Sequence, residues 1–155
     1  MWQIGVWEQG EGLAERVAAL AEGRRALVRA CSHPALLAGL VLDLLVISPG
    51  ATGWAGALAI SCRTALLPGG LPSLARTLPA GAVLSYGTSG RNTISLSGLH
   101  KGRAAVAVQQ EFPSLSGLSV ERQELVLPYD GTLPPDLFLA QVGAALLLDR
   151  IPRQD

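Results

Sequence analysis

The polar residues best suited to binding a ligand gather in one segment, Ser85-Tyr86-Gly87-Thr88-Ser89-Gly90-Arg91-Asn92. Its hydroxyls, amide and backbone can hydrogen-bond a small polar molecule, and the Arg91 guanidinium can contact a carboxylate or phosphate through two N–H groups. The alternative is a loop whose side chains satisfy only its own backbone. The candidate ligand-binding residues of this segment are Ser85, Tyr86, Thr88, Arg91 and Asn92.

A second candidate is the turn Ser48-Pro49-Gly50-Ala51-Thr52-Gly53, between an apolar run and a helical pattern. Backbone N–H groups at such a place can bind an anion, so Ser48 and Thr52 join the candidate ligand-binding residues. The chain has neither GxGxxG nor the P-loop pattern GxxxxGK[ST], and no lysine lies near this turn. The alternative is that glycines only permit tight turns here, and both interpretations also apply to Leu67-Pro68-Gly69-Gly70.

The residue types used in nucleophilic and metal chemistry are few and scattered. The chain has no G-x-S-x-G motif, and neither His33 nor His100 has a carboxylate neighbour in sequence, so both are expected to be structural or solvated. Cys31 and Cys62 lack a CxxC spacing and are expected to be buried apolar side chains. Asp43 interrupts an apolar run and is expected to hydrogen-bond at the sheet edge, with a functional role as the alternative. We predict no catalytic residue, no metal site and no cofactor.

Composition limits the classes of partner. The 155 residues are 49% hydrophobic and 15% charged with a formal net charge of zero, which favours one folded domain over residues 1–155 and no nucleic-acid partner. The longest apolar stretch, Pro34–Ser48, contains Asp43 and is too short to cross a membrane. Without a basic segment near the amino terminus, a cytoplasmic protein with no membrane partner is expected. So apolar a domain can also leave a surface for a protein partner or a homodimer.

The first half of the chain alternates between strand-like and helical patterns. This alternation predicts a mostly parallel sheet with helices on its faces. The predicted strands are Trp2–Trp7, Ala26–Ala30, Leu42–Ser48, Thr64–Leu67 and Ala82–Ser85. The predicted helices are Glu11–Glu22, Ala35–Gly39, Gly53–Ser61 and Pro72–Leu78.

After Tyr86 the pattern changes to consecutive strands, Asn92–Leu99, Arg103–Glu111 and Val120–Pro128, of which the first two form a hairpin around His100-Lys101-Gly102. Val106 and Val108 are expected on the opposite face from Ala105, Ala107 and Gln109. A last helix, Asp136–Arg150, is apolar nearly all round and is expected to be largely buried. The prediction is a single α/β domain with an antiparallel strand extension.

The segment Tyr86-Gly87, followed by Asn92-x-Ile94 and Gly98-Leu99, resembles the later part of the central domain of Mur ligases. In that family a strand ends in Tyr/Phe-Gly, a short antiparallel meander follows, and a turn opens an alanine-rich helix. Here Leu127-Pro128-Tyr129-Asp130-Gly131 precedes Asp136–Ala145, which looks like that helix. The resemblance covers roughly residues 40 to 148, and the chain also resembles small bacterial proteins of similar length that have no assigned activity.

Two departures from the Mur ligase pattern shape the functional expectation. The Gly-Lys-Thr/Ser loop that holds ATP in that family is absent, and its His-Asn pair is replaced around Asp136 to Gln141. The resemblance therefore implies the fold without ligase activity. We expect a non-enzymatic ligand-binding or scaffolding domain linked to cell-envelope precursor metabolism. The alternative is a small-molecule enzyme whose site lies on the strand-end loops.

Overall fold

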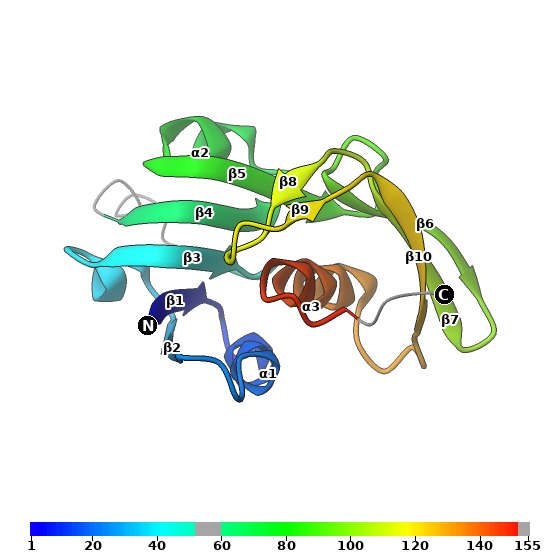
Figure 1. Ribbon diagram of the computed structural model, residues 1–155, viewed down its shortest axis with the longest axis horizontal. Helices are drawn as coiled ribbons and strands as arrows, with labels where there is room; N and C mark the ends of the chain where they lie inside the picture. Colours follow the sequence, from blue (N-terminus) through cyan, green and yellow to red (C-terminus); the bar gives the residue numbers. More distant parts are fainter. Residues whose placement is uncertain (52–59, 152–155) are drawn as a thin grey trace.

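An eight-stranded sheet with the order β10-β7-β6-β5-β4-β3-β1-β2 organises the chain (Figure 1). The structure is a computed structural model that describes residues 1–51 and 60–151. The strands of the main sheet are β1 (Trp2–Trp7), β2 (Ala26–Cys31), β3 (Val41–Ile47), β4 (Ser61–Pro68), β5 (Ala80–Gly87), β6 (Ile94–His100), β7 (Arg103–Val108) and β10 (Gln123–Pro128). The helices are α1 (Leu13–Leu20), the 3-10 turn η1 (Pro34–Leu37), α2 (Pro72–Thr77) and α3 (Pro135–Leu147).

The strands β1 to β5 are parallel, which confirms the predicted α/β class. β1 lies between β2 and β3, so the chain first moves toward one edge of the sheet and then crosses back toward the other. In open α/β sheets, ligands usually bind at the carboxyl ends of the two strands where the strand order reverses in this way, here β1 and β3.

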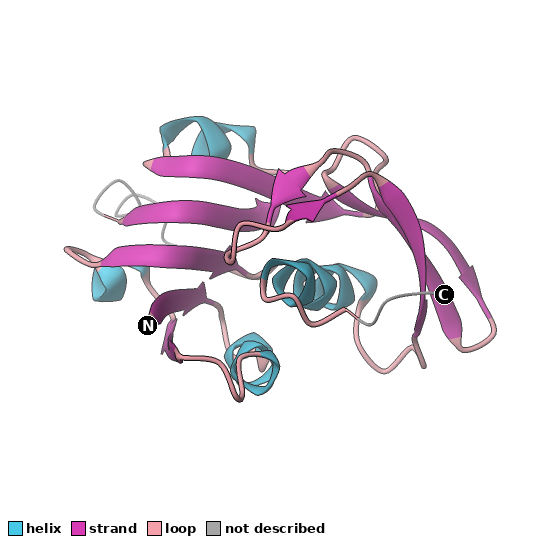
Figure 2. Ribbon diagram, in the orientation of Figure 1, coloured by secondary structure: helices cyan, strands magenta, loops and turns pink. Residues whose placement is uncertain are grey.

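The two faces of the sheet bury two separate cores. α1 and α3 cover one face, where Val6, Val46 and Leu66 point, whereas η1 and α2 contribute to the core on the other face, where Trp7 and Ile47 point. α3 is apolar nearly all round because the antiparallel strands curl around it, as Figure 2 shows, and Leu125 of β10 belongs to the same core. The prediction that this helix is largely buried is thereby confirmed.

The antiparallel extension begins with an offset between β5 and β6. These strands are parallel but pair only at Tyr86↔Ile94 and Gly87↔Ser95, because β6 starts beside the point where β5 ends. Parallel neighbours normally need a crossover of about a dozen residues, and the offset lets the loop 88–93 suffice. Reciprocal bonds hold it in place: the Ser85 backbone N–H donates to the Thr93 hydroxyl, and the Thr93 N–H donates to the Ser85 hydroxyl, both at 3.2 Å.

Several details differ from the sequence prediction. β6 joins the sheet in parallel before pairing antiparallel with β7, and a small hairpin of β8 (Phe112–Pro113) and β9 (Ser119–Val120) was not anticipated. The predicted helix Gly53–Ser61 falls mostly outside the described residues.

Val106 and Val108 are buried, and Ala105 and Ala107 only partly, as the alternation predicted. Within residues 1–51 and 60–151, no helix is long and apolar enough to cross a membrane.

Candidate functional site

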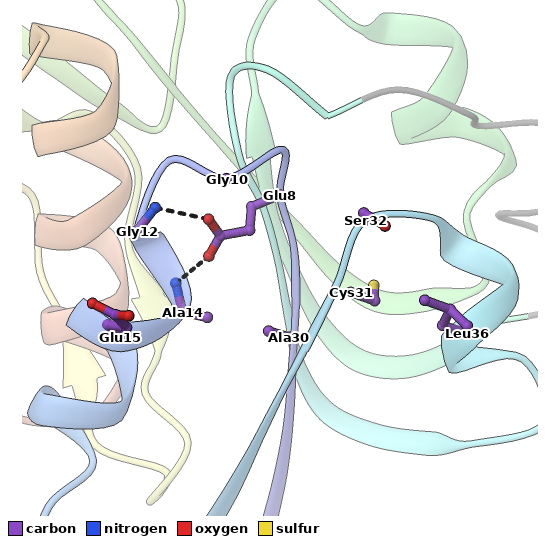
Figure 3. Close-up of a pocket in the computed structure, with 9 residues that line it drawn as sticks. All are labelled: Glu8, Gly10, Gly12, Ala14, Glu15, Ala30, Cys31, Ser32 and Leu36. Carbon is purple, nitrogen blue, oxygen red and sulfur yellow. Dashed lines mark hydrogen bonds between the residues drawn. The ribbon is translucent and has the colours of Figure 1, made fainter.

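The loops at the carboxyl ends of the parallel strands enclose two depressions. One, of about 510 Å³, lies between the β1–α1 loop and the turn after β2; we call it the Glu8 pocket (Figure 3). The other, of about 340 Å³, lies between the turn after β4 and the loop after β5; we call it the Arg91 pocket. It is lined by Pro68, Gly69, Gly70, Tyr86, Gly87, Thr88, Ser89, Arg91, Asn92 and Asp136.

In the Glu8 pocket the protein supplies its own anion. Glu8 is only 8% exposed, and its carboxylate accepts hydrogen bonds from the backbone N–H groups of Gly12 at 2.8 Å and Ala14 at 2.5 Å (Figure 3). These groups belong to the amino end of α1, where N–H donors lack partners within the helix and attract negative charge. In many open α/β sheets a phosphate binds the N–H groups at the amino end of the helix that follows the first strand. Here the Glu8 carboxylate occupies that position.

A second carboxylate, that of Glu11, links the loop after β1 to the turn after β3. Glu11 accepts bonds from the Ser48 hydroxyl, from the Gly50 backbone N–H at 3.1 Å and from the Gln9 backbone N–H at 3.0 Å. The predicted ligand-binding residue Ser48 is buried and bonded to Glu11. Two like charges 4 Å apart repel by about 4 kcal/mol near a protein surface, so Glu11 disfavours a phosphate here. The other predicted residue of this turn, Thr52, lies outside the described residues.

The Arg91 pocket brings together four of the predicted residues, Tyr86, Thr88, Arg91 and Asn92. The fifth candidate of that segment, Ser85, does not line the pocket, because its hydroxyl and its N–H both bond Thr93. The offset between β5 and β6 explains the grouping: it ends β5 at Gly87 and turns the following loop back beside the turn after β4.

Asn92 anchors this pocket. Its side chain is 7% exposed, and its Nδ2 donates to the Ser89 carbonyl oxygen at 3.0 Å. The side chain lies against two glycines: a Cβ atom on Gly69 would stand 1.7 Å from Asn92 Oδ1, and one on Gly87 would stand 2.7 Å from Asn92 Nδ2. Close packing therefore favours glycine at both positions, and the Asn92 side chain packs the loop after β5 against the turn after β4.

Tyr86 is a structural residue of the pocket floor. Its hydroxyl donates to the Ile47 carbonyl oxygen at 2.6 Å, which links β5 to the carboxyl end of β3. Burial raises the pKa of Tyr86 well above its usual value, and the negative charges of Glu11 and Asp136 raise it further. The phenol therefore stays protonated and is committed to the backbone.

Arg91 and Asp136 give the pocket one positive and one negative side chain, and both are exposed. The Arg91 guanidinium and the Asp136 carboxylate form neither a hydrogen bond nor an ion pair with each other or with another side chain in the described part of the chain. Asp136 stands in the first turn of α3, far from Arg91 in sequence. The two side chains are thus available to a ligand.

The remaining candidates have structural partners. His33 accepts the Ala35 backbone N–H through Nδ1 and caps η1, and Asp43 accepts the Gln3 N–H at 2.7 Å, joining β3 to the start of β1. Cys31 and Cys62 are buried free thiols. The residues that the structure describes contain no group of three histidine, cysteine or acidic side chains able to hold a metal ion.

The two cysteines are expected to resist alkylation in the native state. Burial raises the pKa of each thiol from 9.0 to about 11, so at pH 8 the thiolate fraction falls about 100-fold. Iodoacetamide should label the urea-unfolded chain about 100 times faster than the native protein. Below pH 9 the thiols are protonated in both states; between pH 9 and 11 only the unfolded state loses these protons, so stability should fall with rising pH. Equal native and unfolded labelling rates would contradict this.

Sequence reasoning missed Glu8, Glu11 and Asp136 as residues of the carboxyl edge. The available signal was their position, because acidic residues just before or within the first turn of a helix commonly meet its unpaired N–H groups. No family model and no curated protein matches this chain. The fold and the site therefore define an α/β domain whose carboxyl edge carries built-in carboxylates and whose pocket after β5 is lined by the Arg91 guanidinium.

Proposed function

We propose that this protein is a non-enzymatic binding domain that holds a small polar ligand in the Arg91 pocket. The observation that carries the proposal is the seating of Asn92 between Gly69 and Gly87, which leaves Arg91 beside an open depression of about 340 Å³. That volume is at the lower end of the range for ligand pockets, so the ligand is small. Loops held so closely around an unpaired charge are typical of a recognition site.

The chemistry of the lining favours binding over catalysis. The Tyr86 hydroxyl is committed to the Ile47 carbonyl, and no histidine, cysteine or lysine is among the described residues that line the pocket. The one carboxylate among these lining residues, Asp136, forms no hydrogen bond with the hydroxyl of Thr88 or Ser89, so neither hydroxyl is paired with a base that would activate it. The alternative, a small-molecule enzyme using the same loops, predicts turnover of a bound compound and can be tested on the same samples.

The resemblance to Mur ligases supports cell-envelope precursors as the first compounds to test. We place the protein in the cytoplasm, since two buried thiols without a disulfide fit a reducing compartment. A scaffolding role, with a protein in place of the small ligand, remains the other form of the proposal and predicts a partner in a pull-down.

A thermal-shift screen of UDP-sugars, nucleotides, muropeptides, amino acids and short peptides tests the proposal. A ligand present at 100 times its Kd stabilises the protein by about 2.7 kcal/mol, which raises Tm by several degrees. We expect Arg91→Ala to remove most of this shift, and Thr88→Ala to reduce it. Arg76→Ala is the matched control, because Arg76 is exposed on α2 and does not line the pocket.

Each outcome of the thermal-shift screen either supports or contradicts a ligand site in the Arg91 pocket. A shift with at least one compound that Arg91→Ala abolishes and Arg76→Ala preserves supports the site. A shift that both variants retain contradicts it, and product formation from the bound compound favours the enzyme alternative. No shift with any compound, together with no partner in a pull-down, rejects the binding domain.

A further inference from the structure

We infer that the ligand of the Arg91 pocket is a small zwitterion, whose carboxylate pairs with Arg91 and whose ammonium group pairs with Asp136. This inference rests on the proposed function, because it specifies the ligand class of the same pocket. An α-amino acid or a short peptide with free termini has this charge pattern.

The lining of the Arg91 pocket carries one side chain of each charge. Arg91 is the one cationic side chain and Asp136 the one anionic side chain among the described residues that line the pocket. If they formed an ion pair, they would neutralise each other and no ligand charge would be needed. Because they do not pair, a ligand with two opposite charges can satisfy both.

The acidic residues of the carboxyl edge favour a carboxylate over a phosphate as the partner of Arg91. A phosphate needs several donors or a helix end to neutralise its two charges. The helix end at this pocket, the first turn of α3, carries the acidic Asp136, and the N–H groups at the amino end of α1 and after β3 are bonded to Glu8 and Glu11. Asp136 lines this pocket together with Tyr86, and Glu11 is bonded to Ser48, the residue after Ile47, whose carbonyl oxygen accepts the Tyr86 hydroxyl. A singly charged carboxylate on Arg91 suffers less repulsion from these groups than a phosphate does.

The pocket also exposes backbone atoms and is small. Gly70 lines the pocket, and a Cβ atom there would meet no atom within 4 Å, so the backbone of the turn after β4 is uncovered. Peptide-like N–H and C=O groups in the middle of a ligand can hydrogen-bond an uncovered backbone of this kind. A volume of about 340 Å³ suits a compound of one or a few residues rather than a nucleotide-linked precursor.

Isothermal titration calorimetry with matched peptides tests the inference. Diglycine carries both charges, N-acetyl-diglycine only the carboxylate, and diglycine amide only the ammonium group; glycine and triglycine vary the distance between the charges. We expect the best of the three zwitterions to bind at least about tenfold more tightly than either blocked form of diglycine, corresponding to about 1.4 kcal/mol.

Two conservative variants assign each charge. Asp136→Asn should bind free and N-acetylated diglycine with equal affinity, and Arg91→Gln should bind free and amidated diglycine with equal affinity. Both side chains are exposed, so both variants should keep the fold, and Tm without ligand checks this. A merely structural role would weaken all peptides together.

The two proposals can fail separately. If blocked and free peptides bind equally, or if no peptide binds while another compound of the thermal-shift screen does, the zwitterion inference is overturned and the binding domain stands. If no compound of either set binds, the zwitterion inference is overturned, and the binding domain falls with it when the pull-down also finds no partner. The wild-type protein alone decides this, whatever the variants do.

Discussion

Replacing Gly69 by alanine is expected to lower the free energy of unfolding by about 1–3 kcal/mol, the usual cost of overpacking a filled site. The new methyl group would stand 1.7 Å from Asn92 Oδ1, and Asn92 has Gly87 against its Nδ2. The side chain must therefore leave its seat and break its bond to the Ser89 carbonyl oxygen. Urea denaturation followed by circular dichroism measures the loss, and ligand binding to the Arg91 pocket should be lost as well.

Gly70→Ala is the matched control for this prediction. Gly70 is the next residue, its Cβ would meet nothing within 4 Å, and neither glycine has a positive φ. Alanine there should leave stability unchanged or raise it by up to about 1 kcal/mol, since it restricts the unfolded chain. The double variant Gly69→Ala/Asn92→Ala should lose less than the sum of the single losses, because the clash is gone. If the two glycine substitutions changed the free energy of unfolding equally, the close packing of Asn92 against Gly69 would be contradicted.

Replacing Glu8 by alanine is expected to cost about 2–3 kcal/mol of unfolding free energy. The substitution removes a carboxylate that accepts two backbone N–H groups at the amino end of α1 and is nearly buried. The estimate combines the loss of a helix cap with the penalty for donors left without a partner. Thermal and urea denaturation both measure it.

Glu22→Ala is the control for the Glu8 prediction. Glu22 is exposed beyond the carboxyl end of α1, and in the described part of the chain only its backbone is bonded, the N–H to the Ala19 carbonyl oxygen and the carbonyl oxygen to Arg150. A surface substitution of this kind should change stability by less than about 0.5 kcal/mol. Glu8→Gln should fall between the two, because its amide keeps one oxygen acceptor. A Glu8→Ala protein as stable as the Glu22→Ala protein would show that the carboxylate is not needed to cap α1.

Local sequence signals predicted most of the elements, and the reason lies in their pattern of burial. The strand Trp2–Trp7 and the alternation around Val106 are set by which side chains face a core, and that preference is visible in the sequence. The order of strands was not predicted, because it depends on contacts between distant segments. The β8–β9 hairpin was also missed, since each strand has two residues and no periodicity.

The candidate site was predicted in part. The segment after Tyr86 was identified by its polar composition, and the structure places Thr88, Arg91 and Asn92 in one pocket. Asp136 could not be added, because it reaches the pocket only when α3 packs against the sheet. Glu11 could not be paired with Ser48 for the same reason: they lie 37 positions apart and meet only through the strand order.

The most direct test of the Arg91 pocket is an amide ¹H–¹⁵N correlation spectrum recorded during titration with diglycine. We expect the signals of Gly70 and of residues 87–92 to move progressively with added peptide. The signals of Gly12, Ala14 and Gly50, whose N–H groups are held by Glu8 and Glu11, should stay in place. Saturable shifts at the latter three, with Gly70 and residues 87–92 unmoved, would contradict it and place the ligand near Glu8 and Glu11 instead.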